Sequence, residues 1–190
     1  MHLETYRPKP PALALIELSS VARGIHTTDA MLKAAEVELI MSRSICSGKF
    51  MVLVAGEQHE VEASLAAGLD VAKESAIDHV LISNVHPDVY PALSSANELS
   101  RKGALGILEG YSVACLVDAL DHVAKRALVD VVQCRLAMAL GGKAYLVFTG
   151  SVDDVRESLE AGAEVIEARG LLVDKIVIPD PRAELFNTLV

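Results

Sequence analysis

Cysteine is scarce in this chain of 190 residues, which holds three cysteines and no disulfide pattern. Cys46, Cys115 and Cys134 lie far apart in the sequence, and no two of them form a C-x-x-C pair. Such spacing excludes the disulfide framework of a small secreted domain. We therefore expect reduced thiols, either free or bound to a metal.

The chain also has fewer positive than negative charges, and it lacks long apolar runs. The net charge is −9, which argues against binding to the phosphate backbone of a nucleic acid. No apolar run approaches the roughly 18–20 residues of a membrane-spanning helix. Residues 1–11 lack the charged start and apolar core of a signal peptide. We predict a cytoplasmic protein with no nucleic-acid partner and no membrane partner.

Catalytic motifs are missing too. The chain contains no P-loop, nucleophile elbow or dinucleotide-binding fingerprint, so catalysis by the polypeptide is not expected. What is abundant is apolar surface, since 52% of the residues are hydrophobic. This surface must be buried in cores or between subunits, which predicts an obligate oligomer.

Two series of elements follow an extended, Pro-rich arm at residues 1–11, and each series has the order β-α-β-β-α-β. In the first half we predict strands at 12–18, 37–45, 50–55 and 77–85, and helices at 20–36, 57–75 and 89–99. In the second half we predict strands at 104–109, 129–137, 144–149 and 171–178, and helices at 113–128 and 151–168. The inward stripe of the first helix is predicted to be Val21, Ile25, Thr28 and Leu32.

The two halves match residue by residue, which indicates an internal duplication. At an offset of about 92, Glu17, Ser20, Asp29 and Lys33 match Glu109, Ser112, Asp121 and Lys125. After the hairpin turn the offset becomes about 94, so the second turn is about two residues longer than the first. We predict an arm at 1–11 and two domains, at 12–100 and 103–190.

The hairpin turns differ in one functional group. The first turn holds Ile45, Cys46, Ser47 and Gly48, whereas the second holds Leu140, Gly141 and Gly142 and has no thiol. Cys46 taken alone is either a small packing residue or a metal ligand. Cys115 and Cys134 are expected to be core residues.

Each half resembles the shell domain of bacterial microcompartments (BMC domain). The motifs that carry the resemblance are 15–17 and 107–109 at the strand starts, 29–35 in the first helix and 177–181 at the close. The resemblance covers residues 12–190. It implies an α/β chain of the α+β type, with two tandem ferredoxin-like domains that form a pseudohexameric homotrimer.

The resemblance also assigns roles to residues. The two turns fall where the family has its pore, so the residues expected to line it are Ile45, Ser47, Gly48, Leu140, Gly141 and Gly142. Lys33 and Lys125 fall at the tile edge, where they would meet other shell proteins. The alternative for both lysines is a solvated charge at a helix end.

Within the family, the turn is most similar to T-type shell proteins of propanediol-utilisation compartments, in which a cysteine and a Gly-Lys pair sit in the first pore loop. That similarity implies one [4Fe-4S] cluster per trimer on the threefold axis, bound by Cys46 of three chains. One cysteine cannot hold a cluster that usually takes four thiolates, whereas three copies supply three. Ser47 is a departure, because the subtype tends to have proline there.

The expected function is a shell tile that transfers electrons or senses redox state across the shell, with a redox protein of the lumen or cytosol as partner. Two alternatives remain open. One is a shell tile with a cluster-free pore for small metabolites. The other is a soluble ligand-binding regulatory module, since a fold does not determine a function.

Overall fold

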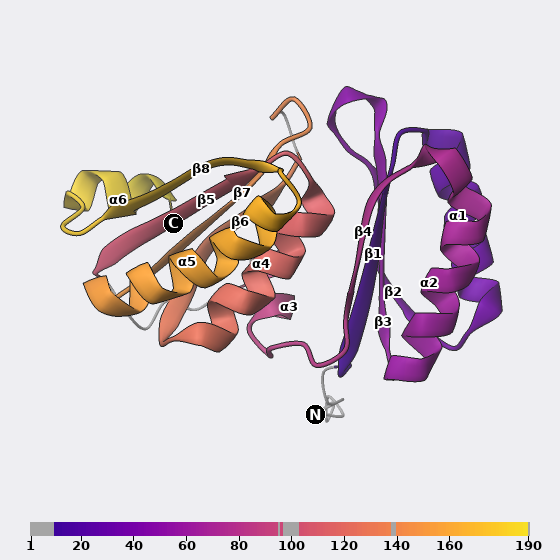
Figure 1. Ribbon diagram of the computed structural model, residues 1–190, viewed down its shortest axis with the longest axis horizontal. Helices are drawn as coiled ribbons and strands as arrows, with labels where there is room; N and C mark the ends of the chain where they lie inside the picture. The colour runs from indigo at the N-terminus through magenta and orange to yellow at the C-terminus, as the bar shows by residue number, and fades with distance from the viewer. Residues whose placement is uncertain (1–9, 95, 97–102, 138–139, 190) are drawn as a thin grey trace, which may run out of the picture.

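The computed structural model describes residues 10–94, 96, 103–137 and 140–189, and within them the chain forms two four-stranded antiparallel sheets. Each sheet carries two helices of its own half on one face (Figure 1). The strand orders, β2-β3-β1-β4 and β6-β7-β5-β8, are those of a ferredoxin-like fold and confirm the predicted duplication.

Domain 1 consists of β1 (Ala12–Leu18), α1 (Val21–Ala34), β2 (Glu38–Ser44), β3 (Phe50–Gly56), α2 (Gln58–Ala72), β4 (Ala76–Ile82) and the short α3 (Val89–Ser94), with single 3-10 turns at Cys46–Gly48 and Lys73–Ser75. Domain 2 consists of β5 (Ala104–Gly110), α4 (Val113–Arg126), β6 (Val129–Leu136), β7 (Ala144–Gly150), α5 (Val152–Ala168), β8 (Leu172–Ile178) and α6 (Ala183–Leu189).

Serine side chains set where three of the helices begin. The hydroxyl oxygen of Ser20 accepts the Arg23 N–H at the start of α1, as predicted. Ser112 caps α4 in the same way. Ser151 caps α5 and also hydrogen-bonds the Asp154 carboxylate. Equivalent caps at α1 and α4 start the two helices in equivalent positions.

The central strand β1 is buried along its whole length because both faces of its sheet are covered. Ile16 packs with the α1 and α2 residues Met31 and Val61. Leu13 and Leu15 point the other way and join a core that includes α4 of domain 2. Helix α4 thus lies between the two sheets (Figure 1), and it joins the domains through one shared core.

The predicted inward stripe of α1 is wrong at three of its four positions. Thr28 is buried, but Val21, Ile25 and Leu32 are exposed. The buried residues of α1 are Gly24, Thr27, Thr28 and Met31. Glycine and threonine are not strongly apolar residues. A prediction from apolar spacing therefore missed the face that they occupy and placed the wrong face of α1 against the core. The helix also ends at Ala34 rather than at residue 36, since Ala35 is extended.

Parts of three predictions lie outside the described residues: the arm at 1–9, the domain boundary at 97–102 and the end of the helix predicted at 89–99. Residues 10 and 11 are described, and the carbonyl of Pro11 accepts the Val85 N–H. Among the described residues, no helix combines the length and apolarity needed to cross a membrane.

Candidate pore site at the paired turns

The first turn joins β2 to β3 and changes direction through two residues with positive φ. These are Ser47 (φ 62°) and Gly48 (φ 73°). The Ile45 N–H donates to the Lys49 carbonyl at 2.9 Å, which closes the turn. Ile45 is buried, and Cys46 is half-buried at the tip. Proline holds φ near −65°, so the backbone at Ser47 differs from any turn that has proline at this position.

The second turn joins β6 to β7 and is built around other left-handed residues. They are Ala137 (φ 51°), Gly141 (φ 62°) and Gly142 (φ 89°). The Lys143 N–H donates to the Leu140 carbonyl at 3.2 Å. A turn of this shape needs glycine, because positive φ strains most side-chain-bearing residues.

The fold brings the two turns into contact. The Cys46 N–H donates to the Ala137 carbonyl at 3.0 Å. The Leu140 N–H donates to the Cys46 Sγ at 3.4 Å. Residues about 94 positions apart therefore hold both the backbone and the sulfur of Cys46.

A buried ion pair lies behind the turns. The Glu17 carboxylate is fully buried and accepts hydrogen bonds from Lys49 Nζ and from the Val113 N–H, both at 2.8 Å. A Cβ on Gly142 would lie 3.5 Å from Lys49 Nζ. Glu17 thus joins domain 1 to the start of α4, while Lys49 packs on the second turn. The repeated Glu and Lys positions were the sequence signal for this pair.

The corresponding pair in domain 2 is more open to solvent. Lys143 Nζ lies 2.5 Å from Glu109, with side chains 37% and 29% exposed. The hydrogen bond that Lys143 donates to the Glu109 carboxylate raises the pKa of Lys143. Equivalent residues therefore have different burial, because only Glu17 is covered by a following domain.

A second polar cluster joins the domains between β4 and α4. Ser112 hydrogen-bonds the Asp78 carboxylate, and Arg169 pairs with Asp78 at 3.1 Å and with Asp118 at 2.7 Å. Burial raises the pKa of Asp118, although the nearby Arg169 opposes the shift. Since the shorter contact goes to Asp118, we regard this carboxylate as ionised and paired. The cluster fixes the orientation of the two domains, which sequence analysis did not predict.

The other two thiols are unsuited to metal chemistry. Cys115 and Cys134 are buried, as predicted, and burial raises the pKa of Cys115 to about 11 and that of Cys134 to about 12. In the part of the chain that the structure describes, no group of three or more His, Cys, Asp or Glu side chains could hold a metal ion. A cluster bound through Cys46 would therefore need several copies of the chain.

The lysines predicted at the tile edge sit at equivalent places near the ends of α1 and α4. Lys33 pairs with Asp29 at 2.6 Å, and both side chains are largely exposed. Lys125 pairs with Asp121, which is only 2% exposed and also accepts the His86 N–H. The structure places both lysines away from the turns, on a different part of the surface.

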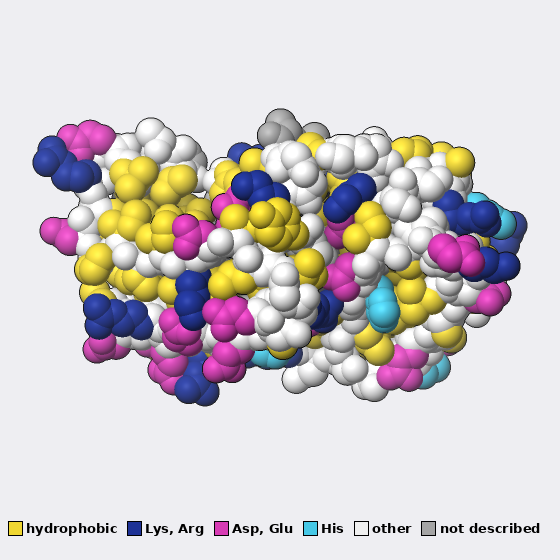
Figure 2. Space-filling view, turned by 45° about the horizontal axis from the view of Figure 1, so that its top comes forward, with side chains coloured by type: hydrophobic (Ala, Val, Ile, Leu, Met, Phe, Trp, Pro, Cys, Tyr) yellow, Lys and Arg dark blue, Asp and Glu magenta, His cyan; other side chains and the backbone are white. Residues whose placement is uncertain are grey.

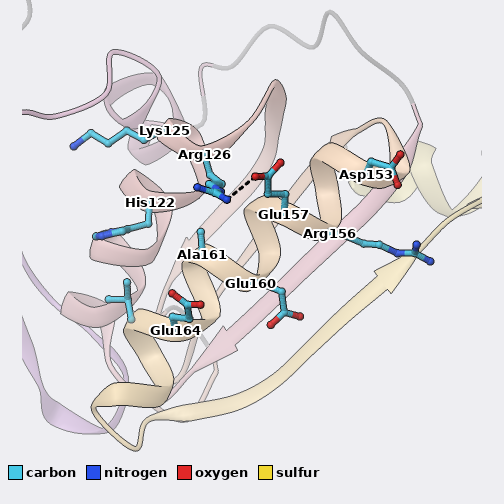
Figure 3. A pocket seen from close by; sticks show the side chains of 10 residues that line it. His122, Lys125, Arg126, Asp153, Arg156, Glu157, Glu160, Ala161 and Glu164 are labelled. Carbon is cyan, nitrogen blue, oxygen red and sulfur yellow. Dashed lines mark ion pairs between the residues drawn. The ribbon is translucent and has the colours of Figure 1, made fainter.

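A groove runs between α4 and α5, and its lining is mostly charged (Figure 3). Its residues are His122, Lys125, Arg126, Asp153, Arg156, Glu157, Glu160, Ala161, Glu164 and Val165. Arg126 and Glu157 pair across it at 2.6 Å. Cations and carboxylates alternate there, so the groove offers no concentrated charge of one sign for a ligand.

Comparison with known proteins agrees with this geometry. A family model for the BMC domain matches residues 12–85 and 104–181. The chain is 36% identical to the bacterial microcompartment shell protein PduT of Citrobacter freundii, over 94% of this chain and 97% of that protein. It is 27% identical to the carboxysome assembly protein CcmO of Synechococcus elongatus, over 94% of this chain and 68% of that one.

Two solved structures are also similar. One is a microcompartment protein from Desulfitobacterium hafniense, with 43% identity, a TM-score of 0.85, and coverage of 94% of this chain and 99% of that chain. The other is the fused permuted hexameric shell protein MSM0275, with 21% identity, a TM-score of 0.63, and coverage of 83% and 84%. The second likeness supports the fold alone.

Proposed function

The chain belongs to the BMC-domain family of bacterial microcompartment shell proteins, and from this premise we propose that three copies close into a tile whose central pore binds an iron–sulfur cluster through Cys46. The chain itself is a structural shell protein, with two BMC domains in tandem. The trimer, the cluster and the transfer of electrons across the shell are the parts of the proposal that need experiment.

The contact between the two domains supports the ring. Val113 and Val117 of α4 are fully buried where α4 packs on the sheet of domain 1. Their counterparts on α1, Val21 and Ile25, are 38% and 60% exposed. The apolar face of α4 is thus buried against domain 1, whereas the equivalent face of α1 is exposed at the other end of the chain. A second copy would cover it by repeating the contact.

The surface that would receive α1 is also present. The outer face of the domain 1 sheet includes Leu15, Met51 and Val80, which are buried under domain 2. Their counterparts in domain 2 are Ile107, Tyr145 and Ile176, which are half-buried or exposed.

Figure 2 shows apolar side chains gathered on the side of domain 2 that carries β8 and α6. A head-to-tail contact of this kind forms a closed ring when its rotation closes. Three two-domain chains would give a ring of six domains.

The position of Cys46 is the single observation that carries the cluster. Its thiol lies at the tip of the first turn, half-buried and against the second turn, so three copies around an axis would present three thiols. Ser47 and Gly48 are small enough for three backbones to approach, and a Cβ on Gly48 would meet nothing within 4 Å. A bound [4Fe-4S] cluster would supply one-electron redox chemistry between the two faces of the shell.

Anaerobic purification with iron and sulfide analysis tests the cluster. We expect about one [4Fe-4S] cluster per three chains in the native protein and none in Cys46→Ala, with the trimer intact in both. Cys115→Ala is the matched control, because its thiol is fully buried in the core and donates to the Ser112 carbonyl, and it should keep the iron.

Colour that survives in Cys46→Ala would contradict the assignment of the ligand. A native trimer that stays colourless after reconstitution would instead support a pore for small metabolites, with Cys46 as a packing residue. A discrete oligomer that never forms sheets or tubes would favour a soluble ligand-binding module.

A further inference from the structure

The second turn has no thiol, yet it makes two contacts with the cysteine of the first. The Ala137 carbonyl accepts the Cys46 N–H at 3.0 Å, and the Leu140 N–H donates to the Cys46 Sγ at 3.4 Å. One contact fixes the backbone of Cys46 and the other fixes its sulfur. Both come from the other repeat, across about 94 positions of sequence.

We propose that the Leu140 main-chain N–H is a positioning group for the Cys46 sulfur, so that the second repeat forms part of the cluster site. This inference rests on the proposed function, because it assigns a donor to the same cysteine. The second turn is about two residues longer than the first, and its Leu140 N–H lies 3.4 Å from the Cys46 sulfur. The first turn thus provides the ligand, and the second turn provides the donor that orients it.

The physical effect follows from the sign of the charge on sulfur. A hydrogen-bond donor is attracted to negative charge, so the Leu140 N–H stabilises a sulfur that binds metal as a ligand. Hydrogen bonds to ligand sulfurs also help to set the reduction potential of an iron–sulfur cluster. A donor here stabilises the reduced, more negative state and thereby raises the potential.

A main-chain ester at position 140 removes this donor while keeping the leucine side chain. The ester variant is made by incorporating the α-hydroxy analogue of leucine at residue 140. Leu140→Ala is the matched control, because it changes the side chain and keeps the N–H. Both variants are compared with the native trimer by size-exclusion chromatography before any measurement at the thiol.

The first readout needs no cluster: the rate of Cys46 alkylation by iodoacetamide in the iron-free trimer, measured across pH. We expect the ester to change the alkylation rate across this pH range by about twofold to tenfold, because the sulfur loses the donor that orients it. Leu140→Ala should follow the native profile. The second readout is the reduction potential of the reconstituted protein, which the ester should lower and Leu140→Ala should leave unchanged.

The outcomes separate the two proposals. An iron-free native protein would defeat the cluster, while the alkylation profile would still decide the role of the Leu140 N–H. Cluster in the native protein, with ester and Leu140→Ala variants that behave alike, would overturn the positioning role and leave the cluster standing. An ester variant that no longer forms the trimer would also overturn it, because the donor would then serve assembly.

Discussion

Single residues with unusual backbone angles shape both turns. Ser47 and Ala137 carry side chains, yet both have positive φ, at 62° and 51°. Such residues are uncommon, and a left-handed conformation costs an L-residue about 1–2 kcal/mol. The Ala137 carbonyl accepts the N–H of Cys46, the residue directly before Ser47. The two strained residues thus flank the proposed ligand: Ser47 follows Cys46 in the chain, and Ala137 accepts its N–H.

Proline at position 47 cannot adopt the observed backbone. Ser47→Pro should therefore destabilise the chain by about 3 kcal/mol or more, or rebuild the turn and lose the contact with Ala137. Ser47→Gly is the control and should stabilise the turn by about 1 kcal/mol. Thermal unfolding and the iron content of the trimer measure both effects. If Ser47→Pro keeps the thermal stability and the iron content of the native protein, this turn accepts a different conformation.

The three thiols should differ in reactivity. With pKa values raised to about 11 and about 12, Cys115 and Cys134 stay protonated at pH 8, so iodoacetamide should label Cys46 alone in the folded, iron-free protein. Mass spectrometry should find one label on the folded chain and three on the unfolded chain. Rapid labelling of either buried thiol at pH 8 would contradict the burial.

The same shifts predict sensitivity to alkali. A thiol whose pKa is raised by folding does not alter the free energy of unfolding below its ordinary pKa of 9.0, because it is protonated in both the folded and the unfolded chain. Above that pH the unfolded chain loses protons that the folded chain keeps. The free energy of unfolding should therefore fall between about pH 9 and 11, and Cys134→Ala should reduce the fall. A pH-independent urea midpoint over this range would contradict it.

At the scale of elements, α1 and α4 are copies with opposite surroundings. Their caps, lengths and positions against their own sheets agree, but only α4 has a second sheet on its other face. That difference explains why Val21 and Ile25 of α1 are exposed. In the proposed trimer this exposed face of α1 is expected to be covered.

Matched charge substitutions on the two helices test this difference. Ile25→Glu should change the stability of the monomer by less than about 0.5 kcal/mol, because the side chain is 60% exposed, yet it should prevent trimer formation. Val117→Glu buries an unpaired charge at the equivalent position and should prevent folding. Circular dichroism and analytical ultracentrifugation separate folding from assembly. A trimer that persists in Ile25→Glu would exclude α1 from the interface.

At the scale of the whole molecule, the two lysines predicted at the tile edge have unequal surroundings. Asp121 is held by both Lys125 and the His86 N–H, whereas Asp29 has an exposed pairing with Lys33. The exposed Lys33 side chain is therefore free to leave its partner at little cost, since surface ion pairs contribute about 0–1 kcal/mol.

Lys33→Ala should keep the trimer and reduce its association into sheets or tubes. Lys175→Ala is the control, because it removes another paired surface lysine, one that contacts Glu160 on α5. Negative-stain electron microscopy at matched concentration compares them. If the native protein and Lys33→Ala form sheets equally well, Lys33 has no role at the tile edge.

The sequence alone determined the duplication, the ferredoxin-like order of elements and the two turns. These follow from local patterns that recur: capping serines, apolar strands, and glycines where the chain must turn. Ser20 and Ser112 start equivalent helices for this reason. The burial of Cys115 and Cys134 followed likewise from their places in a helix and a strand.

Only the tertiary structure decided which copy of each element is covered. Equivalent residues such as Glu17 and Glu109, or Asp121 and Asp29, differ in burial because domain 2 packs on domain 1, whereas among the described residues no further domain packs on domain 2. The contact from Leu140 to Cys46 joins residues about 94 positions apart through a backbone N–H. Every non-proline residue carries a backbone N–H, so no residue type in the sequence could indicate this contact.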